Sequence, residues 1–148
     1  MRAHPEIADA KFVEGYNCAQ SILFSFCDDL GLDEDKALKL ACGFGGGMGR
    51  QGEVCGAVSG GILVLGLIFG RGKNDARLQT DLAYAKIREF MSRFSEKHGS
   101  CLCRELLGGC DLTTPEGQTD FKNNECFNLI CRPCVRNAAG LLSDMTGM

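Results

Sequence analysis

The chain has 148 residues, which is the size of one domain with a single hydrophobic core. Hydrophobic residues make up 45% of it and charged residues 24%, as in ordinary folded globular proteins. A net charge of −3 excludes the basic footprint typical of proteins that bind nucleic acid or an anionic membrane surface. We therefore expect one domain over residues 1–148, without a nucleic-acid partner.

The N-terminal region is predicted to be helical, because apolar residues recur there every three or four positions. Asn17 is the predicted N-cap, with Gln20 as its capping-box partner, and Gly31 ends the segment. Asp33 is then predicted to cap a short helix that reaches Ala41. The apolar stripe of the first segment consists of Phe12, Tyr16, Ala19, Leu23, Phe26 and Leu30.

A glycine-rich segment follows, with the sequence GFGGGMGRQGEVCGAVSGG over residues 43–61. It formally matches G-x-G-x-x-G, but the residues before it indicate a helix and not the strand that dinucleotide binding requires. We therefore interpret the glycines as a tight turn into a buried helix over residues 53–69, which is apolar all round. The pairs Gly56/Gly60 and Gly66/Gly70 are each expected to clear one helix face so that another backbone can approach.

The second half of the chain is predicted to be helical at both ends and cysteine-rich between them. Asp75 is the predicted cap of a long amphipathic helix that ends at Gly99. Residues 100–134 form the cysteine-rich stretch, with a polar loop over 111–124, and a short helix covers 135–145. No alternating strand pattern of useful length is present, so the predicted fold is all-α: a single-domain helical bundle around a buried glycine-rich central helix.

Ten cysteines are the outstanding feature of the composition. The N-terminus lacks the basic start and apolar run of a signal peptide, and the longest apolar run, over 57–69, is too short to span a bilayer. These features predict a cytoplasmic protein without membrane insertion, although a mature secreted chain would look the same. In the cytoplasm, dense cysteine indicates a metal, a cluster or redox chemistry more than structural disulfides.

Several cysteines follow residues that commonly begin helices. A helix N-terminus stabilises a thiolate, so a lowered pKa is expected for these thiols. Nearby arginines would act in the same direction, namely Arg50, Arg104, Arg132 and Arg136. The cysteines are Cys18 after Asn17, Cys55 after the glycine loop, Cys103 after Ser100, Cys126 after Asn124, and Cys131 and Cys134 on either side of Pro133.

The remaining cysteines and the two histidines have plainer interpretations. Cys27 and Cys42 lie within apolar helical patterns and are expected in the core. His4 and His98 are expected to be solvated side chains at the ends of elements. Cys101 and Cys110 are left without an assigned role.

Three cysteine spacings carry chemistry. Cys131-x-x-Cys134 is typical of a dithiol/disulfide pair, although no βαβ pattern of a thioredoxin fold surrounds it. Together with Cys126, this pair also has the spacing of plant-type [2Fe–2S] ligation, which needs one more cysteine. Cys55, Cys103 or Cys18 would supply it. Cys101-x-Cys103 is a third close pair, and a zinc site of four cysteines is a further alternative.

Five blocks spread over the chain resemble the small family of redox-active proteins named for a CGAxxG motif. They are GYNCAQ at residues 15–20, GFGGGMG at 43–49, CGAVSG at 55–60, CRELLG at 103–108, and the spaced pattern of Cys131, Val135 and Ala138 followed by Ala139. The resemblance implies that Cys18, Cys55, Cys103 and Cys131 are redox-active or bind a cluster. This chain has six further cysteines, of which Cys126 and Cys134 are second-rank candidates for a metal.

Three hypotheses follow from these residues. The first is a redox or electron-transfer protein in which Cys18, Cys55, Cys103 and Cys131 ligate an iron–sulfur cluster or form a thiol/disulfide site, with a redox partner protein. The second is a structural zinc-binding module without turnover. The third is a thiol-dependent enzyme, which would be an oxidoreductase. A homodimer is compatible with each of them.

Overall fold

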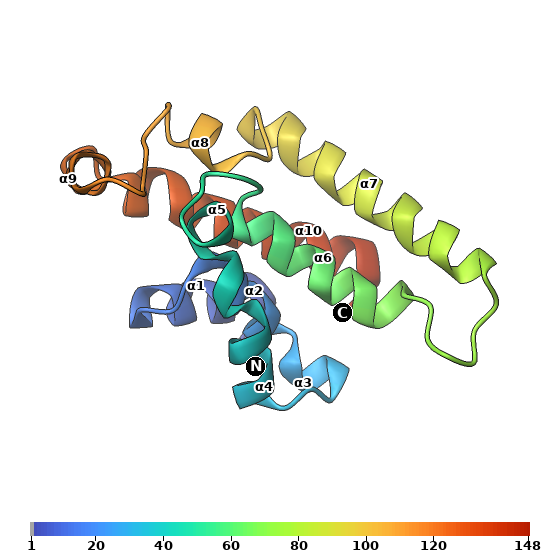
Figure 1. Ribbon diagram of the computed structural model, residues 1–148. Coiled ribbons are helices and arrows are strands. Elements are labelled where there is room, and N and C mark those ends of the chain that lie inside the picture. The colour runs from blue at the N-terminus through green and yellow to red at the C-terminus, as the bar shows by residue number, and fades with distance from the viewer. Residues whose placement is uncertain (1) are drawn as a thin grey trace.

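A computed structural model describes residues 2–148, which form a helical protein (Figure 1). Within these residues there is no strand, only an isolated antiparallel bridge between Val54 and Leu102. No helix in this range has the length and hydropathy needed to cross a membrane. The all-α prediction is therefore confirmed for the described chain. The elements in chain order are α1 (His4–Glu14), α2 (Cys18–Ser25), α3 (Cys27–Leu30), α4 (Glu34–Ala41), the 3-10 turn η1 (Cys42–Phe44), α5 (Gly45–Met48), α6 (Gly56–Phe69), α7 (Leu78–His98), α8 (Cys103–Leu106), α9 (Pro115–Asn123), the π-helical turn η2 (Phe127–Cys131) and α10 (Arg132–Thr146).

The predicted caps in the first part of the chain are confirmed. Asn17 accepts a hydrogen bond from the Gln20 backbone N–H at 2.9 Å, and the Gln20 side chain accepts one from the Asn17 N–H at 3.0 Å. This reciprocal capping box begins α2. Asp33 accepts from the Lys36 N–H at 2.9 Å and begins α4. These bonds join residues three apart, so the local sequence specifies them.

Helix α6 begins at Gly56, three residues later than predicted, with Cys55 as its N-cap. Its residues are largely buried as far as Leu65, whereas Gly66 and Leu67 in the last turns are exposed. A Cβ at Gly60 would lie 2.8 Å from the Ala19 carbonyl oxygen of α2, so the first glycine pair permits close helix contact as predicted. The second pair does not, because the space around Gly66 is open.

Helix α7 begins at Leu78, and Asp75 does not cap it. The Asp75 carboxylate accepts from the Gly72 N–H at 2.7 Å and so closes the loop before the helix. The predicted C-terminal end at Gly99 is correct, since Gly99 has the left-handed conformation common after helices. Figure 1 shows α7 running alongside α6 after this loop, and the two helices are in contact.

The stretch predicted as a polar loop over 111–124 contains helix α9. Thr114 caps it by accepting from the Gly117 N–H at 3.0 Å, and Pro115 occupies the first position, where its missing N–H costs nothing. A Thr-Pro pair is typical of a helix start, but the polar composition of residues 111–124 led to the prediction of a loop. Asn124 ends α9 and does not begin a helix before Cys126, so that predicted cap is wrong.

The C-terminal helix is longer than predicted and has no free N-terminus at Pro133. The π-helical turn η2 leads directly into α10, and Cys131 at the junction has helical backbone angles. A wide π turn accommodates the ring and the missing N–H of the proline that follows. Cys131 and Cys134 therefore do not lie at an exposed helix start, contrary to the prediction.

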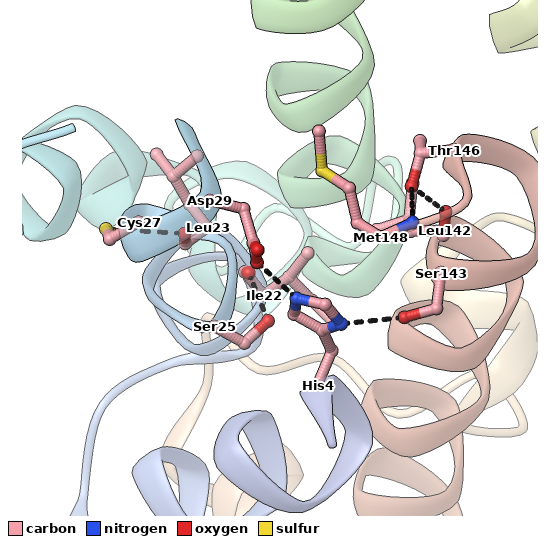
Figure 2. A network of polar contacts seen from close by, with 10 residues as sticks. All are labelled: His4, Ile22, Leu23, Ser25, Cys27, Asp29, Leu142, Ser143, Thr146 and Met148. Carbon is pink, nitrogen blue, oxygen red and sulfur yellow. Dashed lines mark hydrogen bonds and ion pairs between the residues drawn. The ribbon is translucent and has the colours of Figure 1, made fainter. Parts of the chain in front are cut away.

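His4 is packed between helices and is not the solvated side chain expected from its position. Its ring stacks on Phe26 with the centroids 4.0 Å apart. Figure 2 shows its two nitrogens directed at Asp29 and at Ser143 of α10, the latter at 2.8 Å. His4 thus joins α1 to α3 and α10 beside the core, which includes Phe26, Phe90 and Phe94.

Candidate functional site

A cavity of about 310 Å³ lies beside the glycine loop and is lined by five cysteines. They come from different elements: α2, the residue before α6, α8, η2 and α10. The lining cysteines are Cys18, Cys55, Cys103, Cys131 and Cys134. The fold therefore brings together the four cysteines implied by the family resemblance and one second-rank candidate. Cys126, the other one, does not line this cavity.

A short backbone pairing holds Cys55 beside Cys103. The Cys55 N–H donates to the Cys101 carbonyl oxygen at 2.8 Å, and the Cys103 N–H donates to the Glu53 carbonyl oxygen at 2.7 Å. The Arg104 N–H extends the pairing to Gly52 at 3.1 Å. Two segments distant in sequence are thus fixed side by side immediately before α6 and α8.

Glycine is required where the cysteine-bearing elements approach the glycine loop and α6. A Cβ at Gly47 would lie 2.7 Å from the Cβ of Cys103, and the φ of 70° at Gly47 is also unfavourable for other residues. A Cβ at Gly56 would lie 2.9 Å from the Cβ of Cys18. The bare backbone therefore permits the approach of two cavity cysteines.

The pKa shifts of the cavity thiols associate them in two pairs. Interaction with Cys131 raises the pKa of Cys18 well above its ordinary value, and burial and the neighbouring cysteines act in the same direction. Interaction with Cys134 lowers the pKa of Cys55 against the opposing effect of burial; the Ala57 and Val58 N–H groups also stabilise the Cys55 thiolate. Interaction with Cys55 in turn raises the pKa of Cys134.

The expectation of lowered pKa values at helix starts is therefore correct for Cys55 and wrong for Cys18, Cys103, Cys126 and Cys134. Burial raises the pKa of Cys103 to about 12, assisted by the negative charge that Cys55 and its neighbours carry when ionised. Burial likewise raises the pKa of Cys126. Desolvation of a charged sulfur is the largest effect at Cys103 and Cys126, and it outweighs any stabilisation by a helix dipole there.

The arginines expected to favour the thiolates are largely engaged with carboxylates. Arg132 and Arg136 both bind Asp9 of α1, at 2.9 and 3.1 Å. Arg104 lies 3.6 Å from Glu53. Arg50 lies at the cavity wall.

The other cysteines have separate surroundings. Cys27 is buried as predicted and donates to the Leu23 carbonyl oxygen at 3.5 Å, whereas Cys42 is exposed, contrary to prediction. Cys101 and Cys110 are half-buried and donate to backbone carbonyl oxygens of Met91 and Gly117. Cys126 is buried against Cys103 and Leu107.

His98 is a neighbour of the site that the sequence pattern did not reveal. Its Nδ1 lies 3.7 Å from the Cys134 sulfur, and its Nε2 lies 3.2 Å from the Asn137 side-chain nitrogen. Its ring also packs on Phe94, and burial lowers its pKa. His98 is therefore partly buried and not solvated as predicted. Only its occurrence beside a cysteine-rich stretch was visible in the sequence.

The donor set of the cavity is chemically suited to iron, since cysteine thiolates hold iron–sulfur clusters. Within residues 2–148, however, no group of three or more His, Cys, Asp or Glu side chains is arranged to hold a single metal ion. A single zinc ion would require four ligands at bonding distance from one point. The side chains as placed line a cavity and do not form such a tetrahedron.

These features define a class of protein: a helical, cysteine-rich protein with converging thiols in one cavity. Residues 16–145 match the family described as "Putative redox-active protein (C_GCAxxG_C_C)", and the chain belongs to this family. An "Uncharacterized protein" of Archaeoglobus fulgidus is similar to this chain, with 29% identity over 140 residues that cover 90% of this chain and 89% of its own length. No solved structure matches the chain.

Proposed function

We propose that the cavity is a thiol–disulfide redox centre in which Cys55 and Cys134 form one reacting pair and Cys18 and Cys131 the other. The observation that carries this proposal is the gathering of these four cysteines from distant parts of the chain around one cavity, and the pKa shifts support the pairing. Disulfide formation requires two cysteines to lie close together. Cys103 is the fifth cysteine of the same cavity and lies beside Cys55, so it is a further redox-active candidate.

The reaction balances as an exchange with a disulfide of the substrate. A thiolate of one pair attacks a substrate sulfur, forms a mixed disulfide and releases the first substrate thiolate. The second cysteine of the pair then attacks its partner's sulfur and releases the second substrate thiol. Two electrons pass from the protein dithiol to the substrate, and the two thiol protons end on the released thiols.

Disulfide mapping tests this proposal. The reduced protein is oxidised anaerobically with one equivalent of a small disulfide, the free thiols are alkylated, and the peptides are identified by mass spectrometry. We expect Cys55–Cys134 or Cys18–Cys131 linkages in the wild type. Cys134→Ser will remove the first linkage and leave the second, whereas Cys27→Ser, at a buried cysteine outside this cavity, will change neither. A scattered set of linkages, or none, would refute the proposal.

An iron–sulfur cluster is the second candidate, because Cys18, Cys55, Cys103 and Cys131 reach one cavity from four different elements. These four cysteines would hold the cluster, and the cluster would supply one-electron transfer when bound. The protein's part would be to provide thiolates and an apolar wall, which includes Leu106, Phe127 and Ile130. Anaerobic purification with iron, zinc and sulfide analysis and a visible spectrum separates the two: a colourless, metal-free protein with titratable thiols rejects the cluster.

We further infer that the fold is organised around α6. This helix contacts α2, α7 and α10, and its first turns carry the glycines that face α2. Its N-cap residue Cys55 is a site cysteine. Correct placement of α6 is therefore a condition for the proposed chemistry.

A further inference from the structure

We call the cavity lined by the five cysteines the thiol cavity. A second cavity, of about 520 Å³, adjoins it. The two share five lining residues, namely Asn17, Gly46, Arg50, Leu112 and Phe121. We call the larger one the outer cavity. It adds Gln118 and Lys122 of α9 to its lining, so it is more polar than the thiol cavity. A molecule seated in it would lie next to the cysteines.

The charged residues of these two cavities are all positive. Arg50 lines both of them, and Lys122 lines the outer one, whereas no carboxylate residue lines either. Within residues 2–148, neither Arg50 nor Lys122 takes part in an ion pair. Because the whole chain has a net charge of −3, this positive lining is opposite in sign to the protein as a whole.

Arg50 occupies its position against a conformational preference. Its φ is 67°, in the left-handed region that only glycine, asparagine and aspartate adopt readily. Its N–H donates to the Gly45 carbonyl oxygen at 3.1 Å, and its side chain passes over Gly46, where a Cβ would lie 2.9 Å from the Arg50 Cγ. Strained residues of this kind cluster at functional sites. The turn thus carries a long cation where a smaller residue would fit the backbone better.

We propose that the outer cavity binds the anionic group of a small disulfide, such as a carboxylate, and thereby places its sulfur–sulfur bond against the thiols of the adjoining cavity. This inference rests on the thiol–disulfide function proposed above and names its substrate class. Arg50 and Lys122 attract the anion, while the side-chain amides of Asn17 and Gln118, which also line the cavity, donate to the Cys42 and Leu112 carbonyl oxygens. The exchange then proceeds with the balance given above, and the small disulfide leaves as two thiols.

Three small disulfides of different charge test the proposal: dithiodipropionate with two carboxylates, hydroxyethyl disulfide without charge, and cystamine with two ammonium groups. The rate at which each oxidises the reduced protein is measured by acid quench and mass spectrometry, and is divided by its rate with a reduced cysteine peptide. We expect the corrected rate to be highest for the anion and lowest for the cation. The preference should weaken as salt is added.

Two variants test whether Arg50 and Lys122 cause the preference for the anionic disulfide. Arg50→Asn keeps a residue that tolerates the left-handed backbone and removes the charge, and Lys122→Gln removes the second charge from the surface of α9. We expect each to lower the anion-to-cation rate ratio about fivefold, the effect of one exposed charge interaction. Arg88→Gln, at an exposed arginine of α7, is the matched control and should leave the ratio unchanged.

The outcomes separate this inference from the function on which it rests. If all three disulfides oxidise the protein with equal corrected rates, or if Arg50→Asn and Lys122→Gln both keep the wild-type ratio, the anionic substrate class is wrong and the redox function stands. If none of them forms a Cys55–Cys134 or Cys18–Cys131 disulfide, both proposals fail.

Discussion

Because Gly56 has no Cβ, helix α6 can lie close to α2 at Cys18, which lines the thiol cavity. Replacing Gly56 by alanine is a direct test of this packing. The added Cβ would lie 2.9 Å from the Cβ of Cys18 and 3.0 Å from the Ala19 nitrogen. Overpacking of this kind typically costs about 1–3 kcal/mol. Alanine is intrinsically better than glycine in a helix by about 1 kcal/mol at most. We therefore expect Gly56→Ala to lower the free energy of unfolding by about 1–2 kcal/mol.

Gly66 of the same helix supplies the matched control, because nothing lies within 4 Å of a Cβ built there. Gly66→Ala should raise the free energy of unfolding by up to about 1 kcal/mol. Urea unfolding of both variants measures the difference, and alkylation of the folded protein reports whether Cys18 becomes more accessible in Gly56→Ala. If Gly56→Ala is as stable as Gly66→Ala and Cys18 reacts no faster, the close contact between α6 and α2 does not limit packing.

Three further predictions concern residues outside the thiol cavity. The hydrogen bonds and charge of Arg132 lower the pKa of Asp9, so the stability that Asp9 contributes is present above about pH 4 and is lost as pH falls through its folded-state pKa. Asp9→Asn should lower the free energy of unfolding by about 1–2 kcal/mol at pH 7, allowing for the half-exposed arginines, and by little at pH 2; an equal loss at both values would contradict this. Burial raises the pKa of Cys27 to about 11, so its reactive thiolate is scarce at pH 8. In a short iodoacetamide pulse at pH 8, exposed Cys42 should be alkylated, whereas Cys27 should remain unalkylated until the protein unfolds. His4→Ala should cost about 1–3 kcal/mol in thermal or urea unfolding, because it leaves Ser143 without its partner and Phe26 without its stacked ring, and an unchanged transition would show that these contacts do not stabilise the fold.

The caps at Asn17 and Asp33 and the helical class were predictable because the interactions that specify them are local. Asn17 bonds to Gln20 and Asp33 to Lys36, within one turn of helix. Asn124 was misassigned because asparagine is compatible with both ends of a helix, and only the hydrogen bonds of Thr114 determine where α9 lies.

The convergence of the thiols depends on contacts between distant residues. The family resemblance named four of the five cavity cysteines but gave no pairing between them. The placement of Cys18 and Cys55 in one cavity with Cys131 and Cys134 follows from the docking of α2 and α6 against the last helix. Spacing in the sequence instead favoured Cys131 with Cys134. The raised pKa values were also hidden, since burial outweighs local dipoles only in the assembled core.

The separation of the cavity cysteines along the chain has a consequence for how the protein is made. Cys18 and Cys55 leave the ribosome well before Cys131 and Cys134, so for a time they have no native partner. Premature oxidation during that interval would link sulfurs that the finished protein keeps apart, with ten cysteines available to choose among. We therefore expect synthesis under reducing conditions, with any oxidation delayed until the last helix has docked, to give a more uniform product than synthesis under oxidising conditions.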